Sequence, residues 1–180
     1  RDMAKISKAA LENETFRYVA CKPNYYIAPT NKDKHGKELW NHHKMVKRTM
    51  FNYDGVEGGK TGYTTKAGGT LVTFAKRGDQ ELIVVDLCAH GYELYEDTIK
   101  MLNYGFNNYK TIAPFKTMNT VLKDDTYGFL KTGNELSPYK IPLKHLNDVT
   151  VMLEKNQSAS KLTYKCKDNK YIISYDGKQI

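Results

Sequence analysis

The feature that most constrains the fold is a run of three strand-like segments between residues 59 and 89. Residues 59–65, 70–76 and 81–89 carry β-branched and aromatic side chains, and short turn sequences separate them. Consecutive strands joined by short turns pair as an antiparallel meander. The last segment, ELIVVDLCA, is almost continuously apolar, which predicts a strand that is covered on both faces.

Two amphipathic segments flank the meander and predict helices that pack on it. Residues 1–12 and 92–104 repeat apolar side chains every three or four positions, which places those side chains on one helix face. Gly105 follows the second segment and is expected to end its helix. The apolar positions are Met3, Ile6, Ala10, Leu11, Tyr95, Ile99, Leu102 and Phe106.

Shorter elements are expected between the first helix and the meander. Residues 16–20 and 25–28 resemble short strands on either side of a Lys-Pro-Asn turn, and residues 31–37 form a polar loop. Apolar residues between positions 39 and 50 suggest a short helix near residues 41–48.

The pattern changes after residue 112, where helical periodicity gives way to short alternating segments separated by turn residues. We therefore expect two domains. Residues 1–112 should form an α+β domain in which helices pack on an antiparallel sheet. Residues 113–180 should form a small all-β, sandwich-like domain.

Composition argues against several classes of protein. The net charge of +8 is spread along the chain, which is typical of a solvated basic surface rather than a nucleic-acid site. The three cysteines lie far apart and spell no zinc or redox motif. No apolar run approaches the roughly 18–20 residues of a membrane span. We expect no metal site, no cofactor and no nucleic-acid partner.

The lysine at position 60 is the strongest candidate for a binding residue. Lys60 supplies a point charge, Thr61 supplies a hydroxyl group, and glycines on both sides allow the backbone to approach a ligand closely. This combination suits a phosphate or a carboxylate. A phosphate-binding loop needs a glycine where Asp54 stands and a helix after the threonine. Because a strand follows instead, the nucleotide interpretation fails at two points.

Residues 54–68, DGVEGGKTGYTTKAG, closely resemble the low-molecular-mass penicillin-binding proteins, which are D-alanyl-D-alanine carboxypeptidases. In that family the Lys-Thr-Gly motif lies on an edge strand. Residues 1–6, 41–45 and 97–106 are similar to three helices of the family. The resemblance covers about residues 1–112, and the remaining residues match only as a β-rich tail of suitable size.

The resemblance implies serine acyl transfer on peptidoglycan, outside the cytoplasm of a bacterium. A serine attacks the bond between two D-alanines, the terminal D-alanine leaves, and water hydrolyses the acyl-enzyme. Lys60 and Thr61 would bind the carboxylate of the terminal D-alanine or of a β-lactam. Lys60 would also polarise the surroundings of the nucleophile, as the one catalytic residue expected here. Gly62 would keep the strand open, and the Tyr63 N–H would serve as an oxyanion donor.

Several positions depart from the family pattern. Gly59 stands where members commonly carry an apolar residue, which predicts a looser strand, and Leu94 stands about where many carry an arginine. No Ser-x-Asn motif occurs in the 180 residues. Ser-x-x-Lys occurs at 137–140 and 158–161, both downstream of Lys60, where a polar loop is the simpler interpretation.

The missing nucleophile predicts that this chain alone is inactive. Since it opens at Arg1 within a helical pattern, we expect it to be the C-terminal piece of a longer carboxypeptidase. The absent N-terminal part, or another chain, would then cover the sheet edge beside residues 60–63. The alternative is a non-catalytic module that holds cell-wall peptides or positions a partner.

Overall fold

The computed structural model has an α+β fold, as the sequence predicts, and its backbone contacts divide it into two compact units, residues 1–107 and 108–180. The structure describes residues 1–47, 50–113, 121–123, 128–132, 135–136, 149–167 and 170–179. Among these residues, no helix has the length and apolar character that crossing a bilayer requires.

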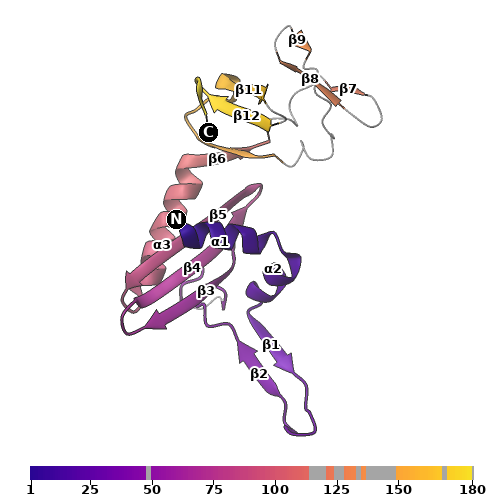
Figure 1. Cartoon of the computed structure of the whole chain (residues 1–180). Coiled ribbons are helices and arrows are strands. Elements are labelled where there is room, and N and C mark those ends of the chain that lie inside the picture. Colours follow the sequence, from indigo (N-terminus) through magenta and orange to yellow (C-terminus); the bar gives the residue numbers. More distant parts are fainter. Residues whose placement is uncertain are drawn as a thin grey trace. The chain divides into compact units, whose positions relative to one another are not determined.

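The first unit is built on a three-stranded antiparallel sheet in the order β3-β4-β5 (Figure 1). The strands are β3 (Val56–Thr64), β4 (Gly68–Arg77) and β5 (Gln80–Ala89), which confirms the predicted meander. The expectation that β5 is covered on both faces holds only for part of the strand. Val84 is buried on the face beneath a helix, but Leu87 on the other face is 59% exposed.

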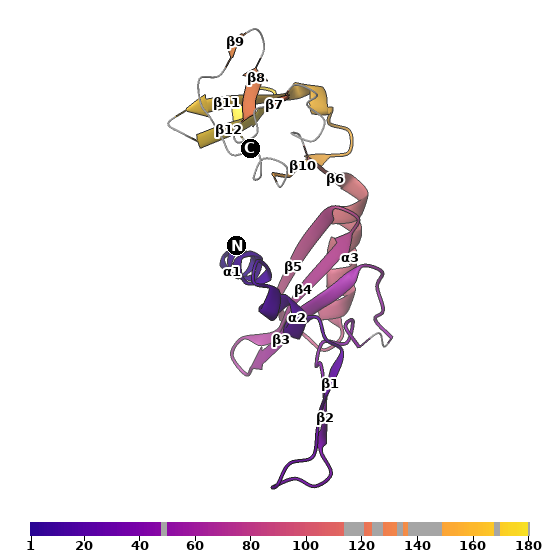
Figure 2. The same cartoon turned by 90° about the vertical axis from the view of Figure 1, so that its right-hand side faces the viewer.

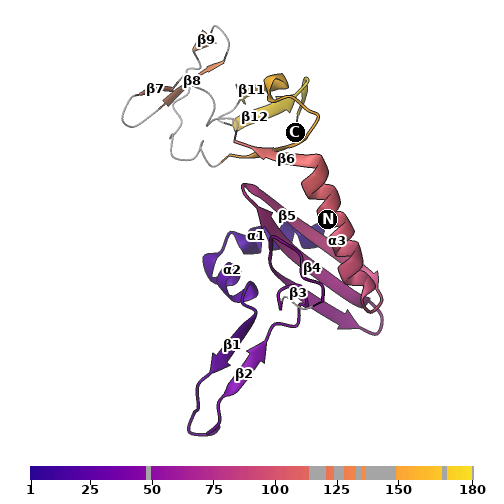
Figure 3. The same cartoon turned by 180° about the vertical axis from the view of Figure 1, so that it is seen from behind.

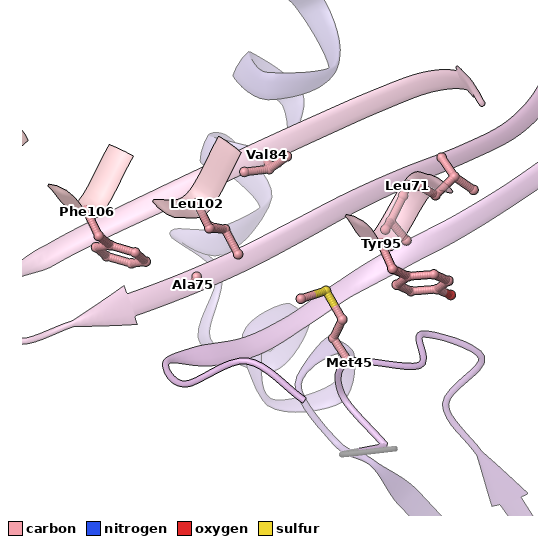
Figure 4. Close-up of a cluster of buried hydrophobic side chains, with 8 residues drawn as sticks. Met45, Leu71, Ala75, Val84, Tyr95, Leu102 and Phe106 are labelled. Carbon is pink, nitrogen blue, oxygen red and sulfur yellow. The ribbon is translucent and has the colours of Figure 1, made fainter. Parts of the chain in front are cut away.

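Helices lie on both faces of this sheet. Helix α3 (Glu93–Asn108) runs along one face, and α1 (Asp2–Leu11) and α2 (Glu14–Ala20) lie on the other (Figures 1 and 3). The main core forms between α3 and the sheet (Figure 4). Its buried members are Met45, Leu71, Ala75, Val84, Leu94, Tyr95, Leu102 and Phe106.

Gly105 does not end α3, contrary to the sequence prediction, because the helix continues to Asn108. A Cβ atom at Gly105 would lie 2.6 Å from Cδ1 of Leu82 on β5. The glycine therefore lets the helix approach the sheet closely, which is a packing role and not a termination signal.

Residues 16–20 form a helix, so the predicted strand there is wrong. The side chain of Asn13 caps α2 by accepting a hydrogen bond of 3.0 Å from the Phe16 N–H. Arg17 then pairs with Glu57 on β3 at 2.9 Å and with Glu81 on β5 at 3.2 Å. Capping and packing on the sheet thus override the strand preference of these aromatic and β-branched residues.

A two-stranded hairpin, β1 (Asn24–Ile27) with β2 (Lys37–Trp40), extends away from the sheet (Figure 2). The strand predicted at 25–28 is confirmed, whereas the helix predicted near 41–48 is wrong over its described part, residues 41–47. There the Asn41 side chain bonds the carbonyls of Ala20 and Lys22 and accepts the His43 N–H. These bonds fix a turn, which we call the 41–47 turn.

The second unit is all-β in its described part, apart from one 3-10 turn (Ala159–Lys161). Strand β6 (Tyr109–Ile112) pairs with β10 (Val151–Glu154), so the compact unit begins at residue 108 instead of 113. Val151, Leu153 and Leu162 form its small core. The other strands are β7 (Val121–Lys123), β8 (Gly128–Thr132), β9 (Glu135–Leu136), β11 (Leu162–Lys167), β12 (Lys170–Tyr175) and β13 (Lys178–Gln179).

Candidate functional site

Strand β3, which carries the predicted site residues, lies at an edge of the sheet and pairs with β4. Lys60 lies opposite Val72, and Thr61 lies opposite Leu71. Among the described residues no other strand pairs with β3. The backbone of this segment therefore has an open side on which an extended ligand could lie.

The four residues predicted for the site are accessible along this strand. Lys60, Gly62 and Tyr63 are exposed, and Thr61 is half-buried. The Lys60 ammonium donates a hydrogen bond to the backbone carbonyl of Thr61. The positive charge therefore stays close to the strand backbone.

Gly59 is required by the side chain packed behind it. A Cβ atom at this position would lie 2.1 Å from the Val72 carbonyl oxygen and 2.6 Å from Cδ2 of His43. The imidazole of His43 thus occupies the space that a side chain at position 59 would need. The space behind the strand is therefore filled at this glycine. This packing argues against the looser strand that the sequence led us to expect.

His43 is fully buried, and its Nε2 atom lies 2.9 Å from the Thr73 hydroxyl oxygen. Its ring meets the Tyr95 ring edge-on, with centroids 5.8 Å apart. Burial lowers the pKa of His43 from 6.5 to about 4, so the ring is neutral at pH 7. The Nδ1 atom is buried without a hydrogen-bond partner in the described part of the chain. We therefore assign the proton to Nε2, since an unpaired buried N–H costs more than an unpaired acceptor.

Comparison with known proteins identifies the family of this chain. The sequence profile of the D-alanyl-D-alanine carboxypeptidases matches residues 1–91, which include the whole Lys-Thr-Gly segment of β3. The chain belongs to this family.

Relatives and solved structures agree with the assignment to the D-alanyl-D-alanine carboxypeptidase family. The chain is 27% identical to the D-alanyl-D-alanine carboxypeptidase DacF of Bacillus subtilis, over 91% of this chain and 45% of that protein. It is 33% identical to the D-alanyl-D-alanine carboxypeptidase of a Streptomyces species, over 59% of this chain and 36% of that protein. The chain thus spans less than half the length of these curated relatives.

The solved structure of the Streptomyces DD-transpeptidase superposes with a TM-score of 0.53 at 30% identity. The match covers 59% of this chain and 41% of that chain. The first unit therefore shares the fold of the penicillin-binding transpeptidases.

Leu94, which stands about where the resemblance implies an arginine in many members, is part of the main core and only 8% exposed. Its Cδ1 atom lies 2.8 Å from the position that a Cβ atom on Gly69 would take. Residue 94 therefore supports the start of β4 and brings no charge to the site.

The two Ser-x-x-Lys sequences of this family member fall in the second unit. The segment 137–140 lies outside the described residues. Ser158 caps the 3-10 turn and bonds Ser160, while the Lys161 ammonium lies 3.4 Å from the Asp176 carboxylate. The segment 158–161 is thus a capped surface turn.

No three His, Cys, Asp or Glu side chains gather into a possible metal site within the described ranges. The residues that sequence reasoning missed are His43 and Lys44, which the 41–47 turn brings behind and beside β3. The signal was the Asn-His-His-Lys sequence at 41–44. Asparagine often starts a turn. Recognising a turn at Asn41 could have indicated that the side chains after it pack against the sheet.

Proposed function

We propose that this chain supplies the substrate-binding strand of a serine-type D-alanyl-D-alanine carboxypeptidase. The whole protein would trim the terminal D-alanine from peptidoglycan pentapeptides through an acyl-serine intermediate and would be acylated by β-lactams. The observation that carries the proposal is an accessible edge strand, β3, that presents Lys60, Thr61 and Gly62 within the segment matched by the family.

In this proposal Lys60 and Thr61 bind the terminal carboxylate of the substrate. A charge-assisted contact of this kind is worth about 1.5–3 kcal/mol. In an antiparallel edge strand every second residue turns its N–H and C=O groups to the open side. The Thr61 carbonyl accepts a hydrogen bond from the Lys60 ammonium, which is consistent with a carbonyl that faces the open side. The Tyr63 N–H would then face the same side and could donate to the oxyanion.

The nucleophilic serine and its lysine base would come from outside this chain. An N-terminal part of the same domain, or another chain, would bring them to the open edge of β3. We further propose that the first unit, residues 1–107, belongs to the catalytic domain and that the second unit, residues 108–180, is a separate β-rich domain. A carboxypeptidase of this kind would work on the cell wall, outside the bacterial cytoplasm.

A second candidate follows from the absence of Ser-x-Asn in this sequence and of Ser-x-x-Lys upstream of Lys60. The chain would then be a binding module that holds wall peptides or positions a partner without catalysis. Labelled penicillin separates the two candidates. The carboxypeptidase proposal predicts a covalent penicilloyl adduct on the whole protein that contains this chain. An unlabelled whole protein would leave the binding module as the better account.

A further inference from the structure

Lys60 and Thr61 project to opposite faces of the sheet. Thr61 lies opposite Leu71, which packs in the core beneath α3. Lys60 lies opposite Val72, whose neighbour two positions on, Phe74, contacts the Phe16 ring of α2 with centroids 6.4 Å apart. Since side chains alternate along a strand, the Thr61 hydroxyl faces the α3 side without the Lys60 ammonium.

An open cavity of about 400 Å³ lies on that side, between the end of β3 and the start of α3. Thr61, Gly62 and Tyr63 form one wall. Lys44, from the 41–47 turn, and His90 are the basic side chains in the lining. The volume is within the range of about 300–1,000 Å³ that is typical of small-molecule sites.

Aromatic side chains hold Lys44 in this lining. Its ammonium lies 4.1 Å from the centroid of the Tyr92 ring, and its backbone N–H lies 3.4 Å from the Tyr95 hydroxyl. Phe51 stacks on Tyr95 with centroids 4.7 Å apart and contacts Tyr92 with centroids 5.2 Å apart. The ammonium is thus placed by a packed cluster, although lysine side chains are flexible.

We propose that Lys44 is a carboxylate-binding residue of this site and acts on the face of β3 where Thr61 projects. A carboxylate offers two oxygens with several acceptor positions. A ligand at the open edge could therefore meet Lys60 from one face of the strand, and Thr61 with Lys44 from the other. This inference rests on the proposed function and adds a specificity residue to it.

The test measures the rate constant for acylation of the whole protein by a fluorescent penicillin in four forms. These are the wild type, Lys44→Gln, Lys44→Arg and Lys47→Gln. Lys47 is a matched control, because it comes from the same turn and lies over an aromatic ring, that of Trp40, at 5.5 Å. Competition by an acyl-D-alanyl-D-alanine peptide and by its C-terminal amide measures recognition of the free carboxylate.

Lys44→Gln is expected to slow acylation about tenfold or more and to shrink the preference for the acid over the amide by a similar factor. Lys44→Arg should retain part of the acylation rate and part of the preference for the acid. Lys47→Gln should behave as the wild type. If Lys44→Gln lowers the melting temperature, Lys44→Met replaces it, because its apolar side chain can still pack on Tyr92.

Wild-type labelling and wild-type acid preference in Lys44→Gln would overturn the role of Lys44 and leave the proposed function standing. An equal loss in Lys47→Gln would also overturn it, because the effect would then reflect general positive charge. A wild-type protein that penicillin does not label would overturn the proposed function, and the role of Lys44 with it.

Discussion

At the scale of single residues, the imidazole of His43 links the candidate site to the core. It fills the space behind Gly59, contacts Thr73 on β4 and packs on Tyr95 of α3. One neutral buried side chain therefore joins the sheet, the helix and the strand that carries Lys60. Changes at His43 or Gly59 are therefore expected to disturb the strand that carries Lys60.

The first prediction concerns the pH dependence of stability. Burial holds the pKa of His43 at about 4 in the folded protein, against 6.5 when unfolded, so the unfolded state binds the proton more readily. Stability is therefore fully present above pH 6.5 and is lost as the pH falls towards 4. The expected loss is about 3 kcal/mol in the free energy of unfolding, measured by urea denaturation across this range.

A His43→Gln variant is the control for this prediction, since glutamine can bond Thr73 but does not titrate. Burial and, after it, the nearby Asp97 raise the pKa of the Asp86 carboxyl. Protonation of Asp86 therefore stabilises the folded state as the pH falls, which opposes the effect of His43. The His43→Gln variant keeps this contribution of Asp86. A variant whose stability falls between pH 6.5 and 4 as steeply as that of the wild type would contradict the assignment.

The second prediction concerns Gly59. Gly59→Ala places a methyl group against the Val72 carbonyl and the His43 ring, and we expect a loss of about 1–3 kcal/mol in the free energy of unfolding. Because the carbonyl belongs to the backbone, His43→Ala should rescue only part of the loss. Gly78→Asn is the control, since nothing would crowd its Cβ atom and asparagine tolerates the positive φ of 57°. Wild-type stability of Gly59→Ala would show that the packing is wrong.

The sequence indicates Lys60–Tyr63 as candidate site residues because the whole signal lies in adjacent residues. His43 and Lys44 could not, because the 41–47 turn brings them to β3 from a distance and their environment depends on Tyr92 and Tyr95. Local pattern thus identifies a strand, whereas the groups behind and beside it depend on tertiary packing.

At the scale of elements, the sequence predicts those helices and strands whose formation depends mainly on neighbouring residues. Strands β4 and β5 carry β-branched and aromatic side chains with a turn between them, and both form as expected. Helix α2 carries similar side chains, yet the Asn13 cap and the pairing of Arg17 with two strands make it a helix. Gly105 is expected from the sequence to end α3, but its close approach to Leu82 gives it a packing role instead. The errors occur where long-range contacts outweigh local preference.

The third prediction concerns the start of α2. Asn13→Ala removes the acceptor for the Phe16 N–H and is expected to cost about 1 kcal/mol in the free energy of unfolding. Asn13→Ser should cost much less, because serine is an equally good capping residue. The comparison is made by urea denaturation at pH 7. Equal stability of the alanine and serine variants would show that the cap is not what fixes this helix.

At the scale of the whole molecule, we propose that the chain provides one wall of a catalytic site. It spans less than half the length of its curated relatives, and β3 presents an edge with no second strand neighbour among the described residues. An edge strand with a lysine and neighbouring glycines fits an extended peptide better than a nucleotide, since no helix follows to hold a phosphate. In this proposal the nucleophilic serine comes from outside this chain.

The fourth prediction tests the central claim that Lys60 on β3 binds the carboxylate that the chemistry requires. The measurement is the rate of penicillin acylation of the whole protein, compared between the wild type and Lys60→Ala. Lys66→Ala, in the exposed turn after β3, is the control. We expect Lys60→Ala to slow acylation at least about tenfold and the control to match the wild type. Acylation of Lys60→Ala at the wild-type rate would contradict the claim.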